Sequence, residues 1–143
     1  MEYKRILGLD IGEKRIGVAV SDLLMLTAQG IESYSRKNDP EDIGYIKKLA
    51  EELGAVKIVC GLPINMNGTE GDQAKKTRDF AEMLGQDTGC EIDYFDERLT
   101  TASANRTLLE ADMSRAKRKK VVDKVAAVYI LQAYMDKANR KEV

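Results

Sequence analysis

The sequence predicts an α/β fold built on one mixed sheet, in which three antiparallel strands are followed by parallel ones. The order of the segments leads to this prediction. Three strand-like segments come first, and helical and strand-like segments then alternate along the chain. The chain has 143 residues and shows neither an internal repeat nor a linker. We therefore expect a single domain over residues 1–143, with a substantial buried core.

Strands near residues 4–10, 15–21 and 27–35 open the predicted sheet. The first of them is an apolar run that closes with Asp10, and Gly12 then permits a tight turn into the second strand. The Asp10 carboxylate should therefore lie where a rigid strand meets a turn. Gly12 and Gly17 would leave room for a phosphate group beside it.

A first helix should begin at Asp39-Pro40, which supply an N-cap residue and a proline in the first turn. Its apolar residues repeat on one face, and they are Ile43, Ile46, Ala50 and Leu53. Gly54 should end this helix. A buried strand is then expected over residues 56–60, and it runs out at Gly61-Leu62-Pro63.

The second half of the chain should hold a helix over roughly residues 70–86 and a short strand over residues 91–95. The residues that this helix should bury are Ala74, Thr77, Phe80, Ala81 and Leu84. Two more helices are expected, over about residues 100–110 and 121–137. The last one carries apolar residues at helical spacing, namely Val122, Ala126, Tyr129, Ile130 and Ala133. Residues 112–120 form either a mobile loop or the first turns of that last helix.

The composition excludes several classes of site. The chain has no histidine, which excludes serine or cysteine triads with a histidine base and histidine zinc sites. The first residues do not resemble a signal peptide, and the apolar run 125–131 is too short to span a bilayer. We therefore expect a cytoplasmic protein without membrane contact. Cys60 and Cys90 should be reduced, because about four residues would separate them along neighbouring strands, beyond disulfide reach.

Charges nearly cancel over the whole chain, with 23 Lys and Arg against 24 Asp and Glu, but they are locally uneven. A basic run contains Arg115, Lys117, Arg118, Lys119 and Lys120. An acidic cluster lies between Glu91 and Glu97. Lys14 and Arg15 in the first turn, and Arg98 after the acidic cluster, are further candidates for contact with phosphates. For each single cation, a solvated surface position is an equally good explanation.

Three carboxylates, those of Asp10, Glu97 and Asp123, are expected to converge. The first two follow strands, and the carboxyl ends of parallel strands line one edge of a sheet, while Asp123 lies near the start of a helix. Such a set suits Mg²⁺ or Mn²⁺, and two ions about 4 Å apart would support phosphodiester hydrolysis. The alternatives are that Asp10 only starts a turn and Asp123 only caps a helix. The residues expected to shape the surrounding loops are Gly12, Gly61, Asn65 and Gly68.

Four ordered motifs extend over essentially the whole chain. They are Asp10-Ile11-Gly12-Glu13-Lys14-Arg15-Ile16-Gly17, Gly61-Leu62-Pro63 with Asn65 and Gly68, Asp96-Glu97-Arg98-Leu99-Thr100-Thr101, and Lys120-Val121-Val122-Asp123 with Ala126-Ala127. Together they resemble the YqgF family, bacterial proteins described as pre-16S rRNA nucleases or Holliday junction resolvase-like proteins. The resemblance implies an RNase H-like fold, with a mixed five-stranded sheet and helices packed around it. It also implies that Asp10, Glu97 and Asp123 are the catalytic acids of a hydrolase acting on ester bonds.

The function implied by this resemblance is processing of the 5′ end of pre-16S ribosomal RNA in ribosome biogenesis. Four-way DNA junctions are the alternative substrate. The implied partners are nucleic acids, either the ribosomal RNA precursor or branched DNA, and pre-ribosomal particles, with the chain acting as a monomer or homodimer. A catalytically silent assembly factor on the same fold is a competing function. A phosphotransferase of the actin-like ATPase type is disfavoured, because it needs two such domains and 143 residues cannot hold them.

Overall fold

A five-stranded mixed sheet forms the centre of the molecule, in the order β3-β2-β1-β4-β5. The computed structural model describes residues 4–99 and 115–140, with side chains described over 4–99 and 124–140. The strands are β1 (Arg5–Ile11), β2 (Arg15–Ser21), β3 (Ala28–Ser35), β4 (Ala55–Leu62) and β5 (Glu91–Asp96). β1, β2 and β3 pair in antiparallel fashion, whereas β4 pairs parallel to both β1 and β5. This is the mixed sheet that the sequence predicts.

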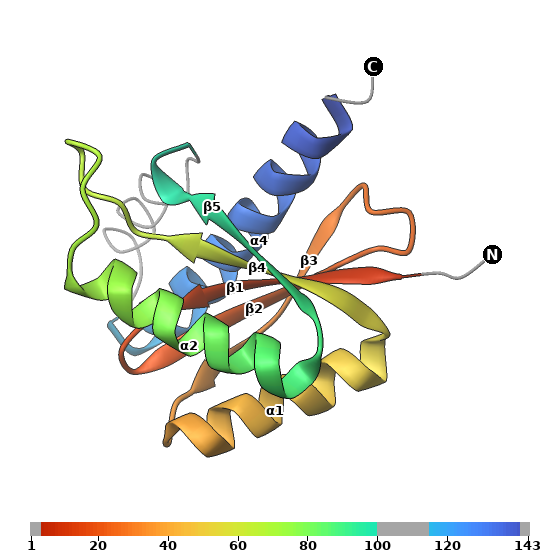
Figure 1. Ribbon diagram of the computed structural model, residues 1–143, viewed down its shortest axis with the longest axis horizontal. Helices are drawn as coiled ribbons and strands as arrows, with labels where there is room; N and C mark the ends of the chain where they lie inside the picture. The colour runs from red at the N-terminus through yellow and green to blue at the C-terminus, as the bar shows by residue number, and fades with distance from the viewer. Residues whose placement is uncertain (1–3, 100–114, 141–143) are drawn as a thin grey trace.

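Helices cover both faces of the sheet (Figure 1). α1 (Asp39–Leu53) and α2 (Asp72–Thr88) pack on one face, around a core that includes Leu7, Leu9 and Phe80. α4 (Arg115–Arg140) packs on the other face, around a core that includes Ile130 and Leu131. A short 3₁₀ helix, η1 (Glu97–Leu99), follows β5. None of the helices in the described part of the chain is long and apolar enough to cross a membrane.

The first two helices agree closely with the prediction. In α1 the N-cap is Asn38 rather than Asp39, because the Asn38 side chain accepts a hydrogen bond from the Glu41 N–H at 2.9 Å. Gly54 ends this helix with a left-handed φ of 66°. In α2, all of the residues expected to be buried are buried. Cys60 and Cys90 are both free thiols, as expected.

The last helix differs from the prediction at its start. It begins at Arg115 rather than near residue 121, so the basic run is helical and the mobile-loop alternative is wrong for residues 115–120. Arg, Lys and Ala are strong helix formers, although the run lacks the apolar spacing that marks a helix in sequence. α4 contacts the sheet through Ala127, Ile130, Leu131 and Met135, whereas Tyr129 is 36% exposed. The helix expected over residues 100–110 lies outside the described residues.

Glycines on three strands let α4 lie very close to the sheet. A Cβ atom at Gly8 would lie 2.7 Å from the Leu131 Cβ, and one at Gly30 would lie 2.7 Å from the Lys124 Cγ. A Cβ atom at Gly61 would collide with the Ile130 side chain. The strand register places Gly30, Ala19 and Gly8 side by side on β3, β2 and β1. We call these small residues, together with Gly61, the glycine trough.

Replacing Gly8 with alanine should therefore destabilise the protein by about 1–3 kcal/mol. The new methyl group would meet the Ala127 carbonyl oxygen at 3.2 Å as well as Leu131, and a backbone atom cannot rotate away. Gly44→Ala is the matched control, because Gly44 lies inside α1 and, apart from its chain neighbours and the backbone of α1 itself, no atom lies within 4 Å of its added Cβ. We expect that change to stabilise the protein by about 0.5–1 kcal/mol. Urea unfolding measures both effects, and a Gly8→Ala protein as stable as the unchanged chain would contradict the close packing of α4.

Candidate functional site

Asp10 lies at the carboxyl end of β1, as the sequence predicts. It is the last residue but one of the strand and pairs with Gly17 of β2. Its neighbours Leu9 and Ile11 are buried in the core under α1 and α2. Because side chains alternate along a strand, Asp10 lies on the opposite face, the face that α4 covers. Its side chain is half-buried there.

Glu97 reaches the same face from the other side of β4. It follows β5 directly, as the first residue of η1, and its Cγ would lie 3.3 Å from a Cβ atom at Gly61. In the register of β1 and β4, Leu9 pairs with Cys60, and Asp10 and Gly61 are the next residues along these strands. The two acids therefore flank Gly61, Asp10 from β1 and Glu97 from the end of β5. The space that a side chain at Gly61 would need is filled by the Ile130 side chain of α4, which packs beside the Glu97 Cγ.

Asp123, the third predicted acid, belongs to α4, and its side chain lies outside those that the structure describes. Its position in the helix is one turn before Ala127, whose carbonyl oxygen faces Gly8. Because Leu131 also contacts Gly8 and Gln132 binds the start of β3, α4 runs from the Asp10 end of the sheet toward the Ile6 end. The backbone of Asp123 thus lies toward the Asp10 end.

The position of Asp123 inside α4 excludes the alternative that this residue only caps a helix. The helix begins at Arg115, so Asp123 lies well inside it and cannot act as its cap. Among the residues that the structure describes with side chains, no group of three or more carboxylates or thiols forms a potential metal site. To hold a metal ion, Asp10 and Glu97 would need a further ligand from a residue whose side chain is not among those described.

Arg98, a predicted phosphate contact, is engaged in a local ion pair. Its guanidinium binds the Asp96 carboxylate, with an Nη2–Oδ2 distance of 2.7 Å, and holds the pKa of that carboxyl below its usual range. Arg98 also donates hydrogen bonds to the carbonyl oxygens of Asn65 and Met66, at 3.4 and 3.5 Å. It therefore ties the loop after β4 to the segment that carries Glu97. Its contact with phosphate stays a prediction.

The loop after β4 is a tight turn built on Asn65 and Gly68. The Gly68 N–H donates to the Asn65 carbonyl oxygen at 2.8 Å, and Gly68 has a φ of 88°, which favours glycine. The Asn65 amide donates to the Thr69 hydroxyl at 3.0 Å. Of the other two glycines expected to shape loops, Gly12 opens the β1–β2 turn, donating to the Arg15 carbonyl oxygen at 2.9 Å. Gly61 lies inside β4 rather than in a loop, since β4 pairs with β5 as far as Leu62.

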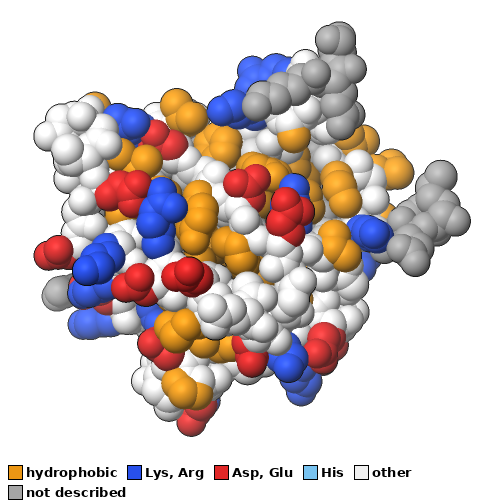
Figure 2. All heavy atoms as spheres, viewed as in Figure 1, with side chains coloured by type: hydrophobic (Ala, Val, Ile, Leu, Met, Phe, Trp, Pro, Cys, Tyr) orange, Lys and Arg blue, Asp and Glu red, His pale blue; other side chains and the backbone are white. Residues whose placement is uncertain are grey.

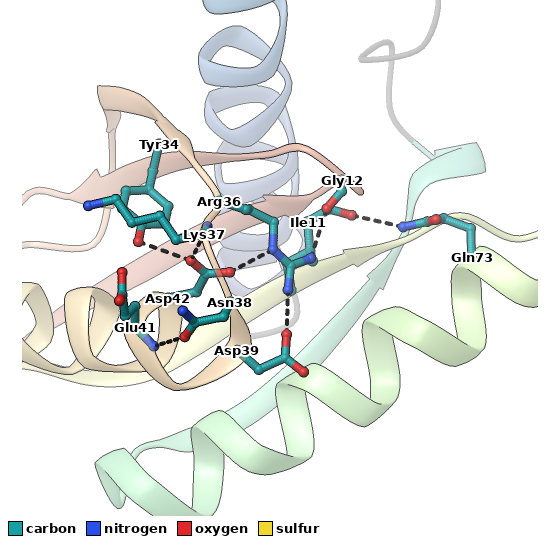
Figure 3. Close-up of polar contacts among 10 residues, drawn as sticks. All are labelled: Ile11, Gly12, Tyr34, Arg36, Lys37, Asn38, Asp39, Glu41, Asp42 and Gln73. Atoms are coloured by element: carbon teal, nitrogen blue, oxygen red, sulfur yellow. Dashed lines mark hydrogen bonds and ion pairs between the residues drawn. The ribbon is translucent and has the colours of Figure 1, made fainter.

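A polar network that the sequence does not reveal holds the β1–β2 turn in place (Figure 3). Arg36 donates to the Gly12 carbonyl oxygen at 2.9 Å and binds the Asp42 carboxylate at 2.9 Å. On the other side of the turn, the Gln73 amide donates to the Ile11 carbonyl oxygen at 3.2 Å. The turn that follows Asp10 is thereby fastened to both α1 and α2.

Asp42 anchors this network and is fully buried. One of its oxygens accepts hydrogen bonds from the Tyr34 hydroxyl and the Lys37 N–H, both at 3.0 Å. Burial alone would raise the pKa of Asp42, but the hydrogen bonds from Lys37, Arg36 and Tyr34 outweigh it, and the pKa is lowered. Burial and the same carboxylate raise the pKa of Tyr34 to about 12. The one signal in the sequence was an acid on the apolar face of α1, four residues before Ile46.

The remaining predicted cations lie around this end of the sheet. Lys14 is exposed in the β1–β2 turn, and Arg15 is half-buried at the start of β2. The basic run Arg115–Lys120 forms the first turns of α4, and its side chains are not among those that the structure describes. On the face that carries α1 and α2, acidic and basic side chains are interspersed (Figure 2). That face therefore has little tendency to attract a polyanion.

The Arg36–Asp42 pair predicts a specific dependence of stability on pH. Because the folded pKa of Asp42 lies below its ordinary value of 3.8, its carboxylate stabilises the fold above that value. This contribution is lost as the pH falls through the lower folded pKa. Asp42→Asn should cost about 3 kcal/mol at neutral pH, since it removes the buried partner of Arg36, and should flatten the loss of stability below pH 4. Asp39→Asn is the control, because that side chain is 54% exposed and its pair with Arg36 contributes little.

Denaturant unfolding across acidic pH measures this dependence. If Asp42→Asn loses stability below pH 4 as steeply as the unchanged chain, Asp42 is not the group that responds.

Comparisons with known proteins identify the family of this chain. The model of the RuvX family, described as a Holliday junction resolvase, matches residues 4–137. A relative from Clostridium acetobutylicum, named "Putative pre-16S rRNA nuclease", is 58% identical over 132 residues, which are 92% of this chain and 98% of that protein. A relative of the same name from Clostridium novyi (strain NT) is 54% identical over the same shares of both chains.

Among solved structures, the RuvC of Thermus thermophilus in complex with a Holliday junction substrate matches with a TM-score of 0.60. The match covers 96% of each chain at 9% identity, so it bears on the fold alone. A second structure of Thermus thermophilus RuvC matches with a TM-score of 0.54 at 11% identity, over 94% of this chain and 96% of that one. The fold is RNase H-like, which confirms what the motifs imply. The chain belongs to the RuvX family, which is the YqgF family that its motifs resemble.

Proposed function

We propose that the chain is a single nuclease domain that hydrolyses phosphodiester bonds at the 5′ end of pre-16S ribosomal RNA, in the cytoplasm. The observation that carries this proposal is the position of Asp10 and Glu97, which flank Gly61 on one face of the sheet. The name shared by relatives with 52–58% identity supports the choice of substrate. The description of the family supports a second candidate, the cleavage of four-way DNA junctions.

The acids fit a hard divalent cation, Mg²⁺ or Mn²⁺. Asp10 and Glu97 offer carboxylate oxygens, the ligands that these ions prefer, and the chain has no histidine to favour a softer metal. Asp123 would supply the further ligand from α4. When bound, such ions lower the pKa of a water molecule and neutralise charge on the phosphate.

The other residues of the site would fix the acids and the substrate. Arg36 and Gln73 hold the turn after Asp10, and Arg98 holds the loop after β4 against the segment that carries Glu97. Gly61 lets the Ile130 side chain of α4 pack against β4 beside the Glu97 Cγ, so the helix that carries Asp123 lies close to the strands. The first turns of α4 carry the basic run immediately before Asp123, so phosphates bound there would direct the strand across the acids.

Asp10→Asn should abolish cleavage, with a loss on the order of 10³-fold or more, while the protein stays folded. The amide fills the same volume but is a poor ligand for a hard cation. Asp79→Asn is the matched control, since Asp79 is exposed on α2, on the other face of the sheet. The measurement is 5′-end mapping on a pre-16S rRNA fragment, beside a four-way DNA junction, with Mg²⁺ or Mn²⁺.

Three outcomes of this assay separate the candidates. Cleavage of the RNA alone supports rRNA processing, and cleavage of the junction alone supports the second candidate. Binding without cleavage of either would show a silent assembly factor. Full activity in the Asp10→Asn protein would overturn the assignment of Asp10.

Replacing Arg118, Lys119 and Lys120 with alanine should weaken nucleic-acid binding and reduce its salt dependence. Alanine preserves the helix, so the change removes charge without removing structure. The slope of log affinity against log salt should fall by up to about three units, roughly one for each phosphate contact. An unchanged slope would show that the run is only a solvated face of α4.

A further inference from the structure

A groove lies beside Glu97, one of the proposed catalytic acids. It runs between the segment formed by β5 and η1 and the C-terminal half of α4. It has a volume of about 440 Å³ and is lined by Phe95, Leu99, Ala133, Asp136, Lys137 and Arg140. We call it the β5–α4 groove. β5 is at the edge of the described sheet, and α4 passes behind it (Figure 1). Phe95 precedes Glu97 by two residues and Leu99 follows it by two, so the groove begins at the site itself.

The groove combines an apolar floor with a basic rim. Phe95 is buried beneath it, whereas the Leu99 side chain is 61% exposed although it is large and apolar. Lys137 and Arg140 stand one turn apart near the end of α4, and the Lys137 Nζ lies 6.0 Å from the centre of the Phe95 ring. Cations at the end of a helix complement its dipole. The dipole does not account for an exposed leucine beside a hollow next to Glu97.

Charge in this part of the molecule favours an anionic occupant. Among the described side chains, no carboxylate lies within 4.0 Å of the cationic group of Lys137 or Arg140. The one acid lining the groove, Asp136, accepts a hydrogen bond from the Gln132 amide at 3.0 Å. The last turns of α4 therefore present two exposed cations and one exposed acid to the groove.

A second hollow of about 270 Å³ lies farther along β5 and shares Phe95 and Lys137 with the β5–α4 groove. A rigid network closes the far side of this hollow. The Lys57 ammonium donates to the Tyr134 hydroxyl at 3.0 Å, and that hydroxyl donates to the Asp93 carboxylate at 2.7 Å. These charges satisfy one another. The net positive charge thus lies at Lys137 and Arg140.

We propose that the β5–α4 groove binds a single-stranded segment of the substrate, next to the bond that is cut. This inference rests on the proposed nuclease function. Lys137 and Arg140 would bind phosphates, and a base would pack on Leu99. The volume suits a ligand of about the size of one nucleotide and is too small for a duplex. An acidic peptide would suit the same charges, but the position of the groove beside Glu97 favours the strand that enters the site.

The test is the binding of a short fluorescein-labelled single-stranded RNA, followed by fluorescence anisotropy over a range of KCl concentrations with EDTA present. The Lys137→Ala/Arg140→Ala protein should bind more weakly, and its salt slope should be about 1.4 units shallower, since each single-strand phosphate contact contributes about 0.7. Lys137→Arg/Arg140→Lys should keep the slope. Leu99→Ser should weaken binding and leave the slope unchanged, because it removes an apolar contact alone.

The matched control is Lys47→Ala/Lys48→Ala, which removes the same charge from α1 on the other face of the sheet. It should keep the affinity and the slope. A wild-type slope in the Lys137→Ala/Arg140→Ala protein would overturn the inference. So would a loss of binding to an oligo-glutamate peptide without a loss of binding to RNA, because the groove would then take a protein segment.

The binding assay requires no turnover, so the two proposals fail separately. If the chain cleaves RNA but the groove variants bind normally, the groove inference is wrong and the nuclease proposal stands. If binding depends on the groove but no substrate is cleaved, the nuclease proposal is wrong, and the groove is a single-strand site of a non-catalytic protein.

Discussion

The close packing of α4 against the glycine trough determines how the other parts of the molecule are placed. A side chain at Gly8 would push the helix away from the strands, and side chains at Gly30 and Gly61 would collide with the Lys124 and Ile130 side chains. With glycine at all three positions, α4 crosses the sheet diagonally, with Lys124 against β3 and Lys137 near Phe95 of β5. This crossing brings the Asp123 turn toward the carboxyl end of β1, and it opens the β5–α4 groove at the other end of the helix.

The two faces of the sheet carry different features. The face under α1 and α2 holds the larger apolar core and the buried Arg36–Asp42 pair, which fixes the turn after Asp10. A buried ion pair is weak grounds for stability in itself, but removing one partner leaves a costly uncompensated charge. Arg36 of this pair also donates a hydrogen bond to the Gly12 carbonyl oxygen, so the pair holds the turn in which β1 ends. The face under α4 carries the acids and the groove.

Much of the fold could be predicted from periodicity and turn residues. The buried residues of α2 and the three-stranded meander were predicted correctly because apolar spacing and glycine turns are local signals. The start of α4 was missed, since a basic run has helix propensity but no apolar spacing. Apolar spacing alone also leaves open which edge of an apolar helix face meets the sheet, and Tyr129 of α4 is 36% exposed.

Some features of the candidate site could likewise be predicted from the sequence, and others could not. Strand ends at Asp10 and Glu97 could be predicted from the order of parallel strands. The Arg36–Asp42 pair could not, because it depends on how a turn, a strand end and a helix meet in space. Arg98 was expected to face substrate, but Asp96, only two residues away, competes for its guanidinium. Sequence patterns identify charges but not the partners that the fold brings to them.

The proposed metal site requires that α4 complete the ligand set begun by Asp10 and Glu97. Mn²⁺ binding, measured by isothermal titration calorimetry, tests it without any substrate. Asp123→Asn should weaken Mn²⁺ affinity by at least about tenfold, and adding Asp10→Asn should cause little further loss, since both acids serve one site. Asp79→Asn should bind as the unchanged chain does. An Asp123→Asn protein with undiminished Mn²⁺ affinity would show that α4 contributes no ligand to a metal site with Asp10 and Glu97.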